Sequence, residues 1–196
     1  MPYSYYQHLP ASEKKIYRAS DKISKVSLKD SSYLLPFVRD VQSALKSKDK
    51  KLVLRASQTL VNHLTQQLEI PPIKVKVLTS RPQNNYGELH GLYDPVSSKV
   101  KVAEVSVWML TAKRKQVVAF KTYMRTLFHE VCHHLDYELY KLEDSYHTEG
   151  FFKRESSLYK QLVEKRMDDV KDVGSNRTNT SCNKDAALNS IHLLLK

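Results

Sequence analysis

The spacing of apolar residues changes several times along the chain, and each change marks a predicted element. Between residues 36 and 68, apolar side chains recur every three to four positions, which is typical of amphipathic helices. We predict one helix from Pro36 in its first turn to about Lys46, and a second that Pro71 and Pro72 end. The apolar positions of the second helix are Val53, Ala56, Leu60, Leu64 and Leu68.

After the prolines the period becomes two, which predicts three short strands. Residues 73–77 and 99–105 alternate between apolar and charged side chains, and residues 86–93 contain two glycines. The segments between them are rich in Pro, Asn and Ser, which favour loops and turns. We therefore predict a small, mostly antiparallel three-stranded sheet.

A long helix is predicted next, from about residues 111–115 to residue 142. Its apolar residues fall on one side at 100° per residue, and His129, Glu130, His133 and Asp136 fall on the opposite side. A loop at residues 143–146 and a last helix at residues 148–167 follow, and we expect this downstream segment to cover the polar side. The apolar residues of the long helix are Val117, Phe120, Met124, Leu127, Phe128, Val131, Leu135 and Leu142.

These elements predict an α+β fold with helices before and after the sheet. We expect residues 1–35 to be a basic, partly ordered arm, residues 36–170 to be a single domain, and residues 171–196 to be a largely disordered tail with a short apolar end. With 196 residues, 41% hydrophobic and 27% charged, the chain has the composition of a globular protein.

Composition also limits where the chain is expected to work. No stretch approaches the roughly 18 apolar residues of a membrane helix, and the first residues lack the apolar run of a signal peptide. The chain has two cysteines, Cys132 and Cys182, too few for a disulfide framework. We therefore expect a cytoplasmic protein that does not enter the membrane.

The net charge is +11, and most of the excess lies in the N-terminal part. Residues 1–70 hold 12 Lys and Arg against 6 Asp and Glu. A basic region of this kind could bind nucleic acid through its phosphates. It could equally be a solvated surface that keeps the protein soluble.

The most specific chemical signal is the motif His129-Glu130-Val131-Cys132-His133 inside the long helix. Residues four apart on a helix lie on the same face, so His129 and His133 can bind one Zn²⁺ together. Glu130 points toward the edge of that face, where it can take a proton from water instead of binding the metal.

A catalytic zinc normally takes three ligands from the protein. His147 is the first candidate for the third ligand, because it lies fourteen residues after His133 at the start of the last helix. The carboxylates of Glu149 and Glu155 are alternatives.

The motif with His147-x-x-x-Phe151 resembles the SprT-like (Spartan-type) zinc metallopeptidase family of the zincin superfamily. The resemblance covers roughly residues 70–165. It implies a zincin-like fold in which a His at the start of the next helix completes the site, and an edge strand that pairs with an extended substrate. Thr148 stands where the family usually has Gly, and two cysteines cannot form the zinc ribbon of many members.

The function predicted from these residues is zinc-dependent hydrolysis of peptide bonds in protein substrates, with Glu130 as the general base. The alternative is a zincin-like domain that binds a partner protein or nucleic acid and cleaves little. Asp136 is either a carboxylate that orients a ligand histidine or a solvated one. Candidates for stabilising an oxyanion are Tyr137, Tyr146, Tyr159 and Arg154.

Overall fold

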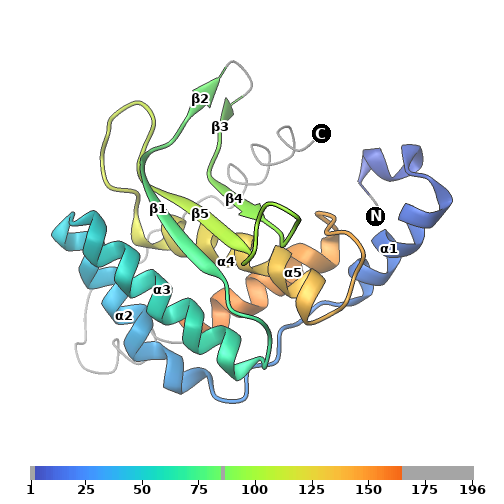
Figure 1. Cartoon of the computed structure of the whole chain (residues 1–196), viewed down its shortest axis with the longest axis horizontal. Coiled ribbons are helices and arrows are strands. Elements are labelled where there is room, and N and C mark those ends of the chain that lie inside the picture. The colour runs from blue at the N-terminus through green and yellow to red at the C-terminus, as the bar shows by residue number, and fades with distance from the viewer. Residues whose placement is uncertain (1–2, 85–86, 165–196) are drawn as a thin grey trace, which may run out of the picture.

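The computed structural model describes residues 3–84 and 87–164 (Figure 1). Its helical elements are η1 (Ser4–His8), α1 (Ala11–Lys22), α2 (Ser31–Ser47), α3 (Lys50–Gln67), α4 (Phe120–Glu138), α5 (Glu149–Tyr159) and the π-helical turn η2 (Lys160–Glu164). Its strands are β1 (Lys74–Ser80), β2 (Gln83–Asn84), β3 (Gly87–Glu88), β4 (Gly91–Asp94) and β5 (Glu104–Leu110). The α+β class is therefore as predicted. The end of the last predicted helix and the predicted tail lie outside the described residues.

The main sheet has three strands in the order β1-β5-β4. β1 and β5 are parallel, with Val75 opposite Val105, whereas β4 runs antiparallel to β5, with Gly91 opposite Val107. The sheet is thus mixed, and the prediction of a mostly antiparallel sheet was wrong. β2 and β3 form a separate antiparallel pair, so the predicted second strand is split and only β4 joins the main sheet.

The third strand was predicted about five residues too early. Residues 99–103 alternate in sequence but lie outside any strand, and Val102 is 46% exposed. β5 is the central strand and is buried along almost its whole length. A central strand reads as a continuous run of apolar and small residues, so its position is not revealed by alternation.

The two helices directly before the sheet, α2 and α3, begin at acidic caps. The Asp30 side chain accepts hydrogen bonds from the backbone amides of Ser32 and Tyr33, so α2 begins at Ser31. Pro36 consequently lies in the second turn and not in the first turn as predicted. Asp49 caps α3 in the same way.

The motif helix α4 is shorter than predicted at both ends. Residues 111–116 form a turn instead, in which the Thr111 amide donates to the Gln116 carbonyl over 2.9 Å. At the other end, Lys141 has a φ of 53°, a left-handed conformation that does not continue a helix. The predicted end at residue 142 therefore lies beyond the last helical turn.

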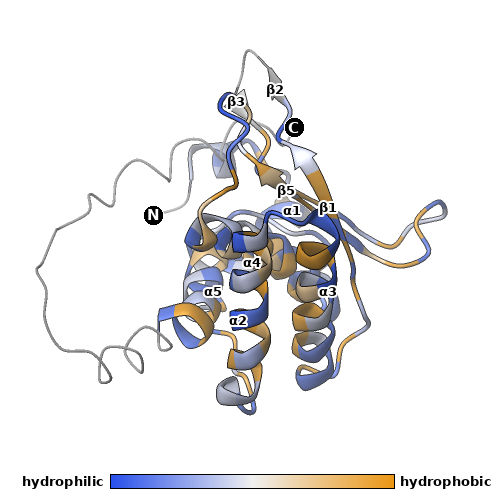
Figure 2. Cartoon of the chain, turned by 90° about the vertical axis from the view of Figure 1, so that its left-hand side faces the viewer, coloured by the Kyte–Doolittle hydropathy of each residue, from blue (hydrophilic) through white to orange (hydrophobic). Residues whose placement is uncertain are grey.

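Helices α2, α3, α4 and α5 lie on one side of the sheet, as Figure 2 shows. α3 packs on β1, and α4 packs on β4 and β5. The shared core is almost free of solvent and contains Val75, Val107, Leu60, Met124, Leu127, Phe128 and Val131. Among the described residues, no helix is long and apolar enough to cross a membrane.

Residues 3–30 are part of this packing. α1 contacts α5, and Tyr17 and Ser20 on α1 are buried. Tyr140, just after α4, donates its hydroxyl to the Lys25 carbonyl over 3.1 Å. The segment before α2 therefore lies against the two helices that carry the candidate site.

Candidate metal centre

The polar side of α4 is buried, as the sequence pattern predicted. Every residue from Leu127 to Asp136 is buried, including His129, Glu130 and His133. Val131 and Leu135 face the core, while α5 and the loop before it cover the histidines. This arrangement takes the two imidazoles out of bulk water and places them in a fixed position.

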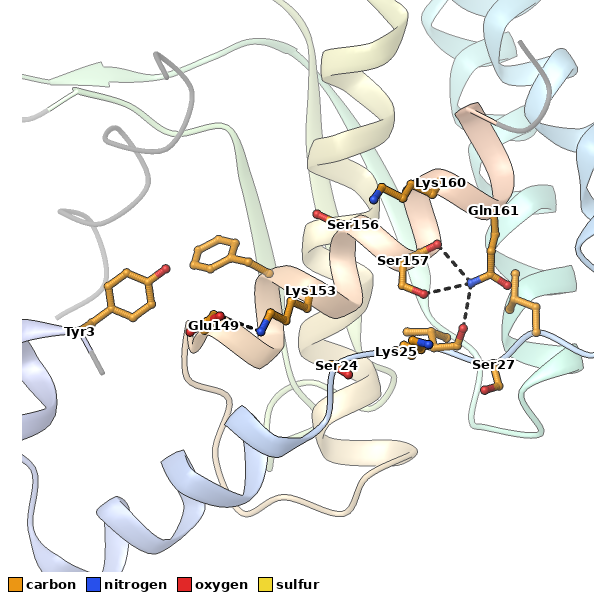
Figure 3. A pocket seen from close by; sticks show the side chains of 13 residues that line it. Tyr3, Ser24, Lys25, Ser27, Glu149, Lys153, Ser156, Ser157, Lys160 and Gln161 are labelled. Atoms are coloured by element: carbon orange, nitrogen blue, oxygen red, sulfur yellow. Dashed lines mark hydrogen bonds and ion pairs between the residues drawn. The ribbon is translucent and has the colours of Figure 1, made fainter. Parts of the chain in front are cut away.

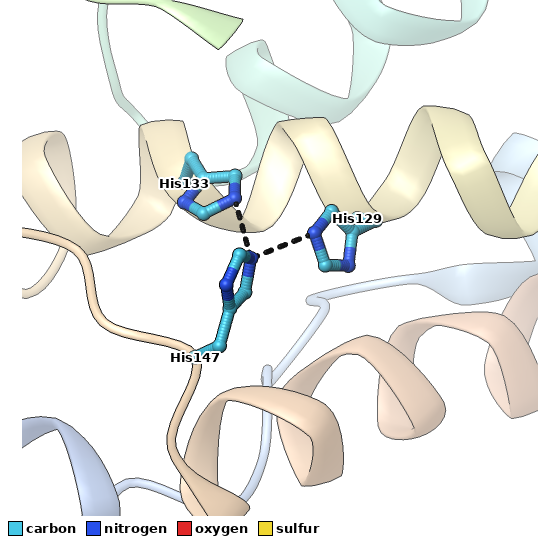
Figure 4. Close-up of side chains that lie close together, drawn as sticks. All are labelled: His129, His133 and His147. Carbon is cyan, nitrogen blue, oxygen red and sulfur yellow. Dashed lines mark hydrogen bonds between the residues drawn. The ribbon is translucent and has the colours of Figure 1, made fainter. Parts of the chain in front are cut away.

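His147 lies directly opposite the two motif histidines (Figure 4). Its Nε2 atom is 3.0 Å from Nε2 of His129 and 3.2 Å from Nε2 of His133. Two nitrogens on a tetrahedral zinc at its usual bond length are about 3.3 Å apart. The three histidines are therefore close enough to bind one metal ion. Among the described residues, this is the group of His, Cys, Asp or Glu side chains that could hold one.

The histidines suit a metal ion because the Nδ1 atoms of two of the rings, those of His129 and His133, already have hydrogen-bond partners. The His129 Nδ1–H donates to Oε2 of Glu155 over 3.1 Å, and Arg125 Nη1 lies 3.7 Å from the other oxygen of that carboxylate. This leaves the Nε2 lone pair of His129 directed at the centre. Glu155 is thus a partner of His129 and lies outside the histidine cluster.

His133 is held through a serine. Its Nδ1–H donates to Oγ of Ser145 over 2.7 Å, and the Ser145 hydroxyl donates to Oδ2 of Asp136 over 2.8 Å. Asp136 is fully buried and is linked to His133 through Ser145. The alternative of a solvated carboxylate is therefore wrong, and the role of Asp136 in orienting a metal ligand stays a prediction.

Asp136 is in turn paired with Arg154 of α5, and both side chains are completely buried. Arg154 Nη2 donates to Oδ1 of Asp136 over 2.6 Å, and Nη1 donates to the carbonyls of Ser20 and Ile23 at the end of α1. Burial raises the pKa of Asp136 to about 6, although the Arg154 charge acts against this shift. One arginine therefore connects the site to the N-terminal segment.

The start of α5 is tightly fitted around His147. The Thr148 side chain caps the helix by accepting from the Phe151 amide over 2.9 Å. A Cβ atom at Gly150 would lie 2.6 Å from the Ser20 carbonyl oxygen, so only glycine allows α1 and α5 to approach this closely. Tyr5 donates its hydroxyl to the His147 carbonyl over 3.1 Å.

Glu130 lies beside the histidines and against the edge strand β4. A Cβ atom at Gly91 would lie 2.7 Å from both Cγ and Cδ of Glu130. Burial raises the pKa of Glu130 to about 7, the charge of His129 lowers it, and Glu155 adds to the rise. A carboxylate in this environment can hold and release a proton near neutral pH.

The surroundings shift the pKa values of His129 and His133 in opposite directions. Burial, together with the positive charge that His129, His147 and Arg154 can carry beside it, keeps the pKa of His133 well below its usual value. Burial also acts to lower the pKa of His129, but its hydrogen bond to Glu155 and the Glu130 charge raise it overall. The site therefore keeps His133 neutral, which is the form that binds a metal.

Aromatic rings enclose the cluster. Phe151 is fully buried, and its ring lies 4.7 Å from that of His133 and 5.1 Å from that of His147. On the other side, Tyr93 of β4 stacks on His133 at 6.1 Å and donates its hydroxyl to Nδ1 of His134 over 3.0 Å. These contacts restrict the rotation of the histidine rings.

The remaining candidates have other partners. Glu149 is exposed and paired with Lys153 over 2.7 Å. Among the four oxyanion candidates, Tyr137 donates to Asp144 and Tyr146 donates to Glu13. The ring of Tyr159 lies 4.0 Å from the Arg125 guanidinium, and Arg154 is fully buried.

Sequence reasoning missed Ser145 and the contacts of Tyr93. Nothing in the spacing of residues 143–146 distinguishes Ser145 from an ordinary loop serine. Tyr93 falls in a predicted strand, but its stacking on His133 depends on how β4 packs against α4. Cys132, between the two motif histidines, is buried, and burial raises the pKa of its thiol.

The fold and site together define an α+β protein with a cluster of three histidines, two buried and one half-buried, that are close enough to bind a metal ion. Comparison of the chain with protein-family models, curated proteins and solved structures finds no match.

Proposed function

We propose that this chain is a zinc-dependent metallopeptidase of the SprT-like, zincin type that hydrolyses peptide bonds in protein substrates. The observation that carries the proposal is the convergence of three Nε2 atoms beside a buried carboxylate, Glu130. Three histidine ligands leave a fourth position open, which is the catalytic arrangement of zinc rather than the structural one.

His129, His133 and His147 would hold the metal. When bound, a zinc ion supplies a Lewis acid that lowers the pKa of water and polarises a carbonyl. Glu155 and Ser145 keep the Nδ1 proton of their histidines in place, so that Nε2 remains free for binding. Phe151 and Tyr93 restrict the rings and exclude solvent from them.

Glu130 carries the proton in this proposal. Hydrolysis adds the oxygen of water to the amide carbon, breaks the carbon–nitrogen bond and delivers a proton to the leaving nitrogen. Glu130 would take the proton from the water and pass it to that nitrogen, as a general base and then a general acid. Its position against Gly91 places it next to the edge strand β4, where an extended substrate could pair by strand addition.

Metal analysis and hydrolysis assays on the full chain test the proposal. The purified protein is expected to contain about one zinc ion. His147→Ala should lose the metal and the activity. Glu130→Gln should keep the metal and lose about 10²–10⁴-fold in hydrolysis of an unfolded protein, because only the proton carrier is removed.

Glu149→Ala is the matched control, because Glu149 lies two residues after His147, in the first turn of α5, and faces solvent. It should keep the metal. Loss of zinc in Glu149→Ala together with retention in His147→Ala would show that the third ligand is wrong. A wild-type protein that binds zinc but cleaves nothing would favour the binding-domain alternative.

A further inference from the structure

A groove of about 930 Å³ runs along the outer side of α5, between this helix and the extended segment before α2 (Figure 3). One wall is formed by α5 and η2 and the other by residues 24–28. Val26 is buried at its base. The Gln161 amide donates to the carbonyls of Val26 and Ser157, which ties the two walls together.

One end of this groove adjoins the histidine cluster. Phe152 lines the groove, and its ring stacks on His147 at 5.8 Å and lies 6.1 Å from the ring of His129. Tyr3 lines the same end and packs edge-on against Phe152. Phe152 is therefore a wall that the groove and the candidate site share.

The groove is long enough for a short stretch of extended polypeptide. From Phe152 to Gln161 the helical rise amounts to about 14 Å. An extended chain advances about 3.3 Å per residue, so about four residues fit along it. The four serines Ser24, Ser27, Ser156 and Ser157 line its sides and can bond to the amide groups of such a segment.

The charge of the groove is positive. Lys25, Lys153 and Lys160 line it, and the one carboxylate of the lining, Glu149, is already paired with Lys153. Lys25 and Lys160 are exposed on opposite walls, so both ammonium groups can reach a segment lying between them. This charge favours carboxylates over neutral or basic side chains.

We propose that this groove binds an acidic stretch of polypeptide, about four residues long, and so selects protein substrates with Asp or Glu residues on one side of the cleaved bond. The role as a substrate site depends on the proposed peptidase function. Binding of the acidic segment does not.

The test uses full-length, zinc-loaded Glu130→Gln protein and fluorescent peptides, with binding followed by anisotropy. The peptides share a Gly-Ser-Ala background and differ in four central residues, which are acidic, neutral or basic. The acidic peptide should bind at least about tenfold more tightly than the neutral one, and the difference should shrink as salt is added.

Reversing the groove charge should remove this preference. Lys25→Glu with Lys160→Glu is expected to weaken acidic-peptide binding by about tenfold or more and to leave neutral-peptide binding unchanged. Lys99→Glu with Lys101→Glu is the control, because it changes the net charge equally on an exposed loop outside the groove. The control should retain the preference.

Equal binding of the three peptides, or equal loss in the groove and control variants, would overturn the proposal. So would a single-stranded oligonucleotide that displaces the acidic peptide and binds more tightly through the same two lysines. If the acidic peptide binds as expected while the wild-type protein cleaves nothing, the groove stands and the peptidase function fails.

Discussion

At the scale of single residues, the candidate site depends on side chains that never touch the metal position. Ser145 is the clearest case, because its hydroxyl links His133 to the buried Asp136. Partners of this kind fix the tautomer and the orientation of a ligand imidazole.

Ser145→Ala should therefore weaken zinc binding by about 10–100-fold while leaving the fold intact. The measurement is competition for zinc against a chromophoric chelator. Ser24→Ala, at an exposed position outside the histidine cluster, is the control and should bind zinc normally. An unchanged zinc affinity in Ser145→Ala would show that the hydrogen bond does not position His133.

Gly91 has a comparable effect on Glu130. Because a methyl group at this position overlaps Cγ and Cδ of Glu130, Gly91→Ala should push the carboxylate aside. A displacement of about 1 Å in a catalytic group can cost about 100-fold in rate, so kcat should fall by that amount. Zinc content should remain near one ion per chain, since no ligand is touched.

The test of Gly91→Ala measures kcat and zinc content in the same preparation and compares both with the wild-type protein. Loss of metal together with activity would mean that the whole site has been disturbed. Normal kcat would mean that Glu130 can move without consequence, which contradicts its role as the proton carrier.

At the scale of elements, α1, α4 and α5 are joined by one buried arginine. Arg154 neutralises Asp136 of α4 and bonds to two carbonyls at the end of α1. Removing one partner of a buried ion pair leaves an uncompensated charge and typically costs about 3–5 kcal/mol.

Arg154→Met should accordingly lower the free energy of unfolding by about 3–5 kcal/mol, as measured by urea denaturation. Adding Asp136→Asn to this variant should cost less than the same substitution in the wild-type protein, because the stranded charge is then removed. Additive effects of the two substitutions would contradict a coupled pair.

The helices and strands differ in how well the sequence predicted them. The helical period predicted α4 and its buried polar side, and the spacing of His147 predicted the cluster, because both depend on local geometry. β5 was misplaced because a strand buried along its length has no alternation. The role of α1 could not be predicted, because Arg154 recognises its backbone carbonyls, which carry no sequence signal.

At the scale of the whole molecule, the positive charge is unevenly placed. The turn between α2 and α3 contributes four exposed lysines around one acidic residue, Asp49, which is engaged as the cap of α3. Nucleic-acid binding through the basic N-terminal region, proposed from the sequence, is expected to depend on this turn. The four lysines are Lys46, Lys48, Lys50 and Lys51.

Deleting the first thirty residues is a poor test of that proposal, because the buried Tyr17 and the carbonyls of Ser20 and Ile23 that bind Arg154 would be lost from the interior. Replacing the four lysines of the turn by Gln removes charge at exposed positions and keeps Asp49 as the cap. Binding of a short DNA duplex should weaken, and the slope of log K against log salt should flatten by about 0.9 for each phosphate contact that is lost.

The matched control replaces four exposed lysines outside residues 1–70, namely Lys99, Lys101, Lys113 and Lys115. Both variants have the same net charge, so a general attraction between the protein and DNA would change their slopes equally. A local site on the α2–α3 turn requires a flatter slope in the first variant only. Equal slopes would assign the binding to the overall charge, and absence of binding by the wild-type protein at low salt would reject a nucleic-acid partner.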